Sequence, residues 1–268
     1  YDEDRWPSGA AGGLVTGDDR FKACSLRCEF VTASGQFTAS GETLGYFALE
    51  RRNGQLSSYR KLTVMPEQPG DYLRVFVLTD PPSNWFNDAT YLDTMNPEAV
   101  ERFLAVTHEA YAREVGDKFG KSVPTIFTDE PNYLHALGHQ IKPWTRKLPE
   151  RYQAQYGENL LDRLPELFFN FGEDFSAPRY RYYRLATELF VTSFARTIGD
   201  WCERHHLALT GHVLREDTLS QQVHSVGAAM PFYDFMQMPG IDLLTEHWMT
   251  FNTVKQMVSK KGIAAPTE

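Results

Sequence analysis

The sequence predicts an α/β protein of the (β/α)8-barrel type. Apolar strand runs and long helical segments alternate at least four times from residue 72 onward, a pattern typical of a parallel sheet with helical crossovers. Acids or histidines follow most of these strands, and a barrel brings such strand ends to one face. A flat doubly wound sheet would normally carry a glycine-rich phosphate loop, and neither G-x-G-x-x-G nor G-x-x-x-x-G-K-[ST] occurs here. We therefore expect one barrel region over residues 1–268.

The part of the chain before this alternation has a different character. Its first twenty residues contain Pro7-Ser8-Gly9 and Gly12-Gly13 and are expected to form a loop. Residues 21–62 show no helical period, only short apolar runs separated by Ser, Gly and Asn. This pattern predicts a small antiparallel β insertion, with Asn53-Gly54 at a hairpin tip.

Hydrophobic periodicity and capping residues predict the helices and strands after residue 72. Asn96-Pro97-Glu98 supplies a cap, a proline at the first helical position and an acid in the first turn, which predicts a helix from there to about residue 116 or 120. A longer helix is expected over Arg179–His205, because Leu185, Leu189 and Phe194 recur at helical spacing. The expected strands are 72–78, 123–127, 207–210, 241–244 and 262–265, and the remaining helices are 218–228 and 252–259.

Composition and charge exclude several classes of partner. Of the 268 residues, 42 % are hydrophobic, 13 % aromatic and 23 % charged, as in an ordinary folded domain. The net charge of −8 repels phosphate backbones, so nucleic acid is not an expected partner. No window reaches about 18 consecutive apolar residues, so no transmembrane helix and no membrane partner are expected. The start at Tyr1 rather than at methionine predicts a processed chain or a piece of a longer polypeptide, and the compartment is not indicated.

The three cysteines fit neither a metal site nor a disulfide framework. Cys24 and Cys28 lie four residues apart on one expected strand, about 13 Å at ~3.3 Å per residue, which is too far for a bond between them. Together with Cys202 they are expected to be free thiols.

The chemistry is expected at the carboxyl ends of the strands. The residues found there are Asp80, Asp129, Glu130, His212, Glu216, Glu246, His247 and Glu268. Carboxylate pairs with opposed protonation states perform acid and base steps at glycosidic bonds, while Trp and Tyr faces cover sugar rings. Metal-assisted hydrolysis is the competing chemistry, but H-E-x-x-H is absent, and His135 and His139 have no evident third ligand.

Each candidate also has a purely structural explanation. An acid after a strand is more often a loop cap or an ion-pair partner than a catalyst. Glu130 stands out, because a stiff apolar strand delivers Asp129-Glu130 directly into a turn fixed by Pro131. His212 is equally compatible with a core histidine, and Asp2-Glu3-Asp4 with a solvated loop as much as with a substrate or cation site. The tyrosines at 180, 182 and 183 are expected to pack a helix.

Several motifs, taken in order, resemble a known family. They are Tyr1-Asp2-Glu3-Asp4-Arg5-Trp6-Pro7-Ser8-Gly9 with Ala11-Gly12-Gly13, Asn96-Pro97-Glu98, Phe127-Thr128-Asp129-Glu130-Pro131, Leu209-Thr210-Gly211-His212 and Pro239-Gly240-Ile241-Asp242. This series resembles the catalytic region of large bacterial glycoside hydrolases of the α-L-rhamnosidase kind, family 106. The resemblance implies a (β/α)8 barrel of which this chain covers about strands 2 to 7.

The resemblance also implies roles for individual residues. Glu130, after the fourth barrel strand, is the implied general acid, and Glu268 at the seventh-strand position is the implied base, with Glu216 and Glu246 as substitutes. Rhamnosidases of this kind use calcium near the sugar hydroxyls, so a Ca²⁺ site is implied by resemblance alone. We expect Asp2, Glu3, Trp6, Asp129, His212, Glu246 and Trp248 to contact the sugar.

These expectations predict a glycosidase that removes a terminal sugar, α-L-rhamnose by resemblance, through two carboxylates. Inversion is the expected outcome and requires carboxyls ~6.5–9.5 Å apart, whereas ~5–5.5 Å indicates retention. One alternative is a non-catalytic carbohydrate-binding or fragmentary barrel domain that lacks its base. Another is a β-galactosidase-like glycosidase. The expected partners are a glycoside or oligosaccharide substrate and the rest of a longer polypeptide.

Overall fold

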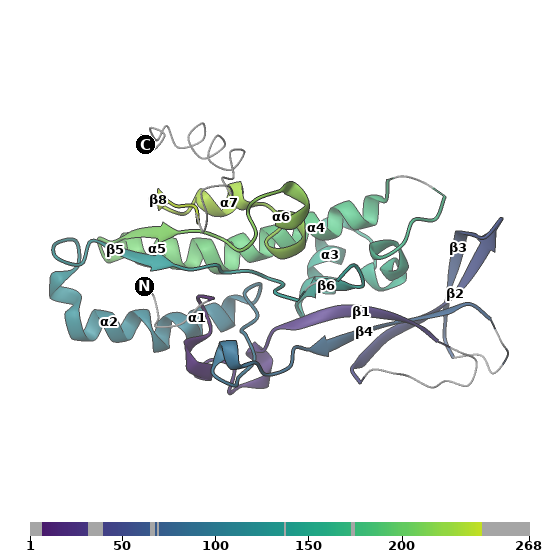
Figure 1. The fold of residues 1–268 in the computed structure, drawn as a ribbon, viewed down its shortest axis with the longest axis horizontal. Helices are drawn as coiled ribbons and strands as arrows, with labels where there is room; N and C mark the ends of the chain where they lie inside the picture. Colours follow the sequence, from purple (N-terminus) through teal and green to yellow (C-terminus); the bar gives the residue numbers. More distant parts are fainter. Residues whose placement is uncertain are drawn as a thin grey trace. The chain divides into compact units, whose positions relative to one another are not determined.

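The computed structural model describes residues 7–31, 40–64, 68, 70–136, 138–172 and 175–242, and it is a mixed α/β fold (Figure 1). The chain divides into two compact units, each built from separate stretches of sequence. Unit 1 comprises residues 1–23, 80–135 and 187–268, and unit 2 comprises residues 24–79 and 136–186. Within the described residues no helix is both long enough and apolar enough to cross a membrane.

Unit 2 is built on a five-stranded antiparallel sheet with the strand order β3-β2-β4-β1-β6. The strands are β1 (Cys24–Val31), β2 (Glu42–Arg52), β3 (Gln55–Leu62), β4 (Tyr72–Thr79) and β6 (Ile141–Trp144). Asn53 and Gly54 join β2 to β3 with positive φ at both positions, as a two-residue hairpin turn requires, so the predicted tip is confirmed. The predicted run Gln36-Phe37-Thr38 lies outside the described residues.

The strand predicted at residues 72–78 exists, but its predicted place in a parallel sheet is wrong. β4 pairs antiparallel with both β1 and β2, so Asp80 follows an antiparallel strand and not a barrel strand. An apolar run identifies a buried strand without fixing the direction of its neighbours, which explains the error.

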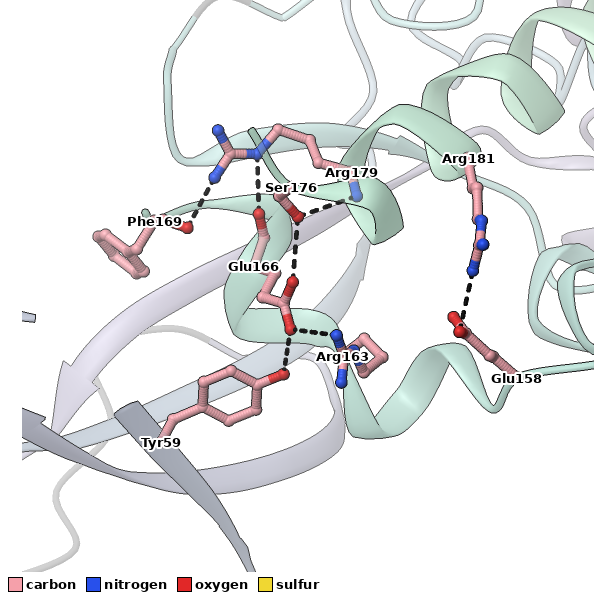
Figure 2. Close-up of polar contacts among 8 residues, drawn as sticks. All are labelled: Tyr59, Glu158, Arg163, Glu166, Phe169, Ser176, Arg179 and Arg181. Carbon is pink, nitrogen blue, oxygen red and sulfur yellow. Dashed lines mark hydrogen bonds and ion pairs between the residues drawn. The ribbon is translucent and has the colours of Figure 1, made fainter. Parts of the chain in front are cut away.

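Helical segments complete unit 2, and carboxylates anchor them. They are α3 (Leu148–Tyr156), the 3₁₀ turns Leu160–Asp162 and Leu164–Leu167, and the first part of α4 (Ala177–Phe190). Figure 2 shows Glu166 at the centre of this region, where it accepts hydrogen bonds from Tyr59 and Ser176 and pairs with Arg163. Arg179 donates to the main-chain carbonyls of Glu166 and Phe169, which fixes the start of α4 (Figure 2). Side chains far apart in sequence thus tie the helices to β3.

Unit 1 contains a parallel sheet of three described strands in the order β5-β7-β8. They are β5 (Thr125–Thr128), β7 (Ala208–Gly211) and β8 (Met238–Pro239). The helices are α1 (Pro97–Val106), α2 (His108–Val115), the π-helical turn Val191–Arg196, α5 (Thr197–Arg204), α6 (Leu219–Ser225) and α7 (Ala229–Tyr233). The strands at 123–127 and 207–210 are confirmed within one residue or two. Three parallel strands do not close a barrel within the described part of the chain, so the (β/α)8 barrel stays a prediction.

The three predicted helices that lie within the described residues begin within two residues of the expected positions, and one of them is interrupted. The Asn96 side chain accepts from the Glu98 N–H at 3.2 Å, as its capping role requires. The helix breaks at Thr107, whose hydroxyl donates to the Phe103 carbonyl at 2.8 Å and lies 2.8 Å from His108 Nδ1. The helix predicted at 179–205 runs through α4, the π turn and α5, and the helix predicted at 218–228 is present as α6.

The structure also answers the expectations about the tyrosines of α4 and about the cysteines. Tyr182 is fully buried and donates to the Pro143 carbonyl, so packing explains it, whereas Tyr180 is exposed. The three cysteines are buried and free. Burial raises the pKa of the Cys28 thiol to about 12, which leaves it protonated and unreactive at neutral pH.

An ion pair is buried inside the sheet of unit 2. The Arg74 guanidinium lies 2.7 Å from Glu29, which is its cross-strand partner, and donates to the Thr43 hydroxyl and the Gly41 carbonyl. The two side chains are 4 % and 13 % exposed. Removal of one partner of such a pair leaves a buried charge without its counter-charge.

We therefore expect Arg74→Met to lower the free energy of unfolding by about 3–5 kcal/mol. The double variant Arg74→Met/Glu29→Leu removes both charges and should recover most of that loss. Urea unfolding of the whole chain, followed by circular dichroism, measures both. A double variant no more stable than the single one would contradict this account.

Candidate functional site

The carboxyl ends of β5, β7 and β8 lie side by side and carry the candidate site. Thr128 pairs with Gly211, and Gly211 pairs with Pro239, so the residues that follow these strands leave one edge of the sheet. The His212 N–H donates to the Thr128 carbonyl at 3.2 Å and the Gly240 N–H to the Gly211 carbonyl at 2.7 Å. These bonds extend the ladder beyond the strands and place Asp129, His212 and Asp242 at neighbouring strand ends.

Gly211 permits this close approach of the strands. Its φ is +126°, and a Cβ at this position would lie 1.9 Å from the Thr128 carbonyl oxygen. No other residue type fits that space without a shift of the backbone.

Asp129 and His212 form a pair across the first two strand ends. The His212 Nε2 lies 3.2 Å from Asp129 Oδ1, and the side chains are 8 % and 15 % exposed. Burial raises the pKa of Asp129, with a further rise from the charge of Asp242 and an opposing effect of His212. Ser8 fixes the backbone, because its N–H donates to the Asp129 carbonyl and its hydroxyl accepts from the Asp129 N–H, both at 2.8 Å.

Glu130 combines a strained backbone with a perturbed carboxyl group. Its φ of +50° is unusual for a residue with a side chain, and such conformations cluster at functional sites. Burial raises the pKa of its carboxyl to about 7, with further rises from the charges of Asp129 and Asp242 and an opposing effect of Arg215. Within the described part of the chain, no hydrogen bond or ion pair engages the Glu130 carboxyl. This group is therefore protonated up to about neutral pH and available to another molecule.

Glu216 lies in the same region, but its carboxyl group is hydrogen-bonded within the protein. It is 4 % exposed, accepts from the Tyr233 hydroxyl at Oε2 and accepts from the Asp242 N–H at Oε1, 3.0 Å away. Burial raises the pKa of the carboxyl to about 7, although both hydrogen bonds lower it. Because each oxygen already accepts a hydrogen bond, Glu216 fixes the segment after β8 and is poorly placed to activate water.

Two residues of this site were not among the predicted candidates. Asp242 was assigned to a strand at 241–244, whereas the third strand is Met238–Pro239, so Asp242 follows a strand end like the other acids. The motif Pro239-Gly240 was the available signal, since both residues favour the end of a strand. Arg215 has a φ of +56° and donates to the His135 carbonyl at 3.1 Å and to Ser225 Oγ at 3.0 Å, and nothing in the sequence indicated this.

The other predicted residues lie outside the described residues. They are Asp2, Glu3, Trp6, Glu246, His247, Trp248 and Glu268, together with the helix predicted at 252–259 and the strand predicted at 262–265. Their roles stay predictions.

A calcium site was implied by resemblance alone. Among the described residues, no group of three or more His, Cys, Asp or Glu side chains is arranged to hold a metal ion. Asp129 pairs with His212, and Glu216 accepts a hydrogen bond from Tyr233. These acids by themselves therefore do not form a calcium site.

Comparison with known proteins gives a distant structural likeness. No protein-family profile and no curated protein matches this chain. A solved structure of a rhamnosidase from Novosphingobium sp. PP1Y is similar over 68 % of this chain, with a TM-score of 0.47 and 20 % sequence identity. The chain spans 19 % of the length of that rhamnosidase.

The raised pKa of Glu216 predicts a pH dependence of stability. The folded protein holds this proton up to about pH 7, whereas the unfolded chain releases it near the ordinary value of 4.5. The folded state therefore binds more protons in this window, so the free energy of unfolding falls as the pH rises through it.

We expect Glu216→Gln to flatten this fall by an amount on the order of 1–3 kcal/mol between pH 4.5 and 7. Urea titrations at several pH values measure the slope. Glu203→Gln, at an exposed position of α5, is the matched control and should leave the slope unchanged. An unchanged slope in Glu216→Gln would show that this carboxyl does not keep its proton in the folded state.

Proposed function

We propose that this chain carries the catalytic acid of a glycoside hydrolase, and that Glu130 is that acid. The observation that supports this most directly is the pKa of Glu130, raised to about 7 by burial and by two neighbouring acids. A general acid must still hold its proton at the pH at which the enzyme works. The unengaged carboxyl at the end of a stiff strand meets the second requirement, which is access to a substrate oxygen.

In the proposed reaction the Glu130 proton passes to the glycosidic oxygen while the bond from that oxygen to the anomeric carbon breaks. A second carboxylate takes a proton from water, and the oxygen of that water forms the new bond to the anomeric carbon. This is the inverting course, which we favour for this chain. The terminal sugar that leaves is α-L-rhamnose in the narrower form of the proposal.

The identity of the second carboxylate follows partly by elimination. Glu216 has both oxygens occupied by Tyr233 and by the Asp242 N–H, which argues against it as the base. Glu268 and Glu246 therefore remain the proposed candidates for this role.

The sugar subsite draws on both ends of the chain in this proposal. Asp129 and His212 would accept and donate hydrogen bonds to sugar hydroxyls. Asp2, Glu3, Trp6 and Trp248 would complete the subsite.

The proposal predicts a distinctive loss of activity in Glu130→Gln. We expect kcat/KM for alkyl glycosides to fall about 10²–10⁴-fold, since the amide cannot donate the proton. For 4-nitrophenyl glycosides the loss should be smaller, because that leaving group needs little protonation. Rates of hydrolysis over a panel of alkyl and aryl glycosides, α-L-rhamnosides included, measure both.

The controls separate this role from a general defect. Glu203→Gln should hydrolyse the panel like the parent chain. Equal losses for alkyl and aryl substrates, or full activity in Glu130→Gln, would remove the acid assignment. If the parent chain binds sugars and hydrolyses none of the panel, the non-catalytic carbohydrate-binding alternative replaces the proposal.

A further inference from the structure

Unit 2 contains a pocket that lies apart in sequence from every described residue of the candidate site. Its volume is about 420 Å³, within the range of about 300–1,000 Å³ that small-molecule sites occupy. All of its lining residues belong to unit 2, whereas Asp129, Glu130, His212, Glu216 and Asp242 belong to unit 1.

The floor of the pocket is formed where three strands meet. Cys24 of β1 is in register with Thr79 of β4 and with Trp144 of β6, so these side chains share one face of the sheet. Arg146 follows β6, Pro149 belongs to α3, and Leu161 comes from the 3₁₀ turn Leu160–Asp162. Strand ends and helical segments thus enclose one hollow; β1, β4 and β6 are seen in Figure 1.

The lining residues offer hydrogen-bonding groups that the protein does not use. Trp144 is 4 % exposed, yet its indole N–H makes no hydrogen bond within the described part of the chain. The indole N–H is not one of the buried polar atoms that lack a partner, so it is open to solvent and to a ligand. The charged ends of Glu42 and Arg146 are likewise without an ion pair among the described residues. Trp144 and Arg146 thus give the lining two donor groups and Glu42 gives it one acceptor group, none of them engaged among the described residues.

The charges and the apolar side chains restrict what that ligand is. Glu42 and Arg146 contribute one negative and one positive charge, so the lining has no net charge that would select an anion or a cation. Leu44, Val77 and Leu161 supply apolar surface between these groups. A ligand that alternates hydroxyl groups with C–H surface matches this pattern, and its hydroxyls both donate and accept.

We propose that this pocket is a second carbohydrate site, which binds a neutral mono- or disaccharide between Glu42, Trp144 and Arg146. Adjacent hydroxyls would donate to the Glu42 carboxylate and accept from the Arg146 guanidinium. Another ring oxygen or hydroxyl would accept from the Trp144 indole N–H. This site binds without hydrolysis, so it does not depend on Glu130.

The indole N–H provides a direct test in the whole chain. The sequence has five tryptophans, and ¹⁵N labelling resolves one indole signal for each, with that of Trp144 assigned from Trp144→Phe. The probes are methyl α-L-rhamnopyranoside, methyl α-D-glucopyranoside and maltose, with sodium acetate as the anionic probe. We expect at least one neutral saccharide to shift the Trp144 signal in a saturable way, and acetate to leave it unchanged.

Variants then separate this pocket from the candidate catalytic site. Arg146→Met should weaken the saturable shift about tenfold or more, because hydrogen bonds to charged groups are the stronger ones. The matched control is Arg151→Met, an exposed arginine of α3 outside the pocket, which should bind like the parent chain. Glu130→Gln should retain the Trp144 shift, and Arg146→Met should retain any hydrolysis of aryl glycosides.

The proposal has clear points of failure. It is overturned if no neutral saccharide shifts the Trp144 signal, if acetate alone does so, or if Arg146→Met binds as well as Arg151→Met. Loss of the Trp144 shift in Glu130→Gln would assign the binding to the candidate catalytic site. A failure of the hydrolysis tests with an intact Trp144 shift would remove the proposed function and leave this site in place.

Discussion

The close approach of β5 and β7 at Gly211 is the constraint on which the candidate site depends. Parallel strands bring the residues that follow them close together only if the strands stay paired up to their last residue. At this position a Cβ would lie 1.9 Å from the Thr128 carbonyl oxygen, so the ladder closes only because residue 211 has none. The next bonds, from His212 to Thr128 and from Gly240 to Gly211, depend on that closure. Asp129, His212 and Asp242 are neighbours for this reason.

Acids crowded in this way cannot all be ionised at low cost, and the site divides the charge among them. Asp129 keeps a histidine partner, while Glu216 is buried and bound by Tyr233 and by a main-chain N–H. Glu130 receives no such partner, and the charges of Asp129 and Asp242 act on it in the same direction as burial. Glu130 and Glu216 both hold a proton up to about pH 7, and of these two carboxyls only that of Glu130 is without a hydrogen bond among the described residues.

The sequence predicted the local features and not the direction in which strands pair. Asn53-Gly54, the cap at Asn96 and the strand before Asp129 all depend on nearby residues, and all three are present. β4 was assigned to a parallel sheet because its apolar run does not indicate the direction of its neighbours, and it pairs antiparallel with β1 and β2. β6 was not predicted, and its Pro143 is tolerated because β6 is the edge strand of its sheet.

The residues of the candidate site were likewise predicted only in part. Asp129, Glu130 and His212 follow recognisable strands, and the structure brings them together. Asp242 was displaced by a strand placed three residues too late. Arg215 and Tyr233 act through folded contacts that leave no pattern in the sequence.

Residues 24–79 leave and rejoin the chain of unit 1 at neighbouring positions. Cys24 pairs with Thr79, and the Asp80 N–H donates to the Ala23 carbonyl at 3.0 Å, so this stretch begins and ends at neighbouring points. Residues 136–186 belong to the same unit and add β6 to its sheet, so unit 2 is assembled from two stretches of the chain. The residues that shift the pKa of Glu130 are Asp129, Asp242 and Arg215, all of unit 1. The charges that act on the pKa of the acid thus come from the same unit as the acid itself.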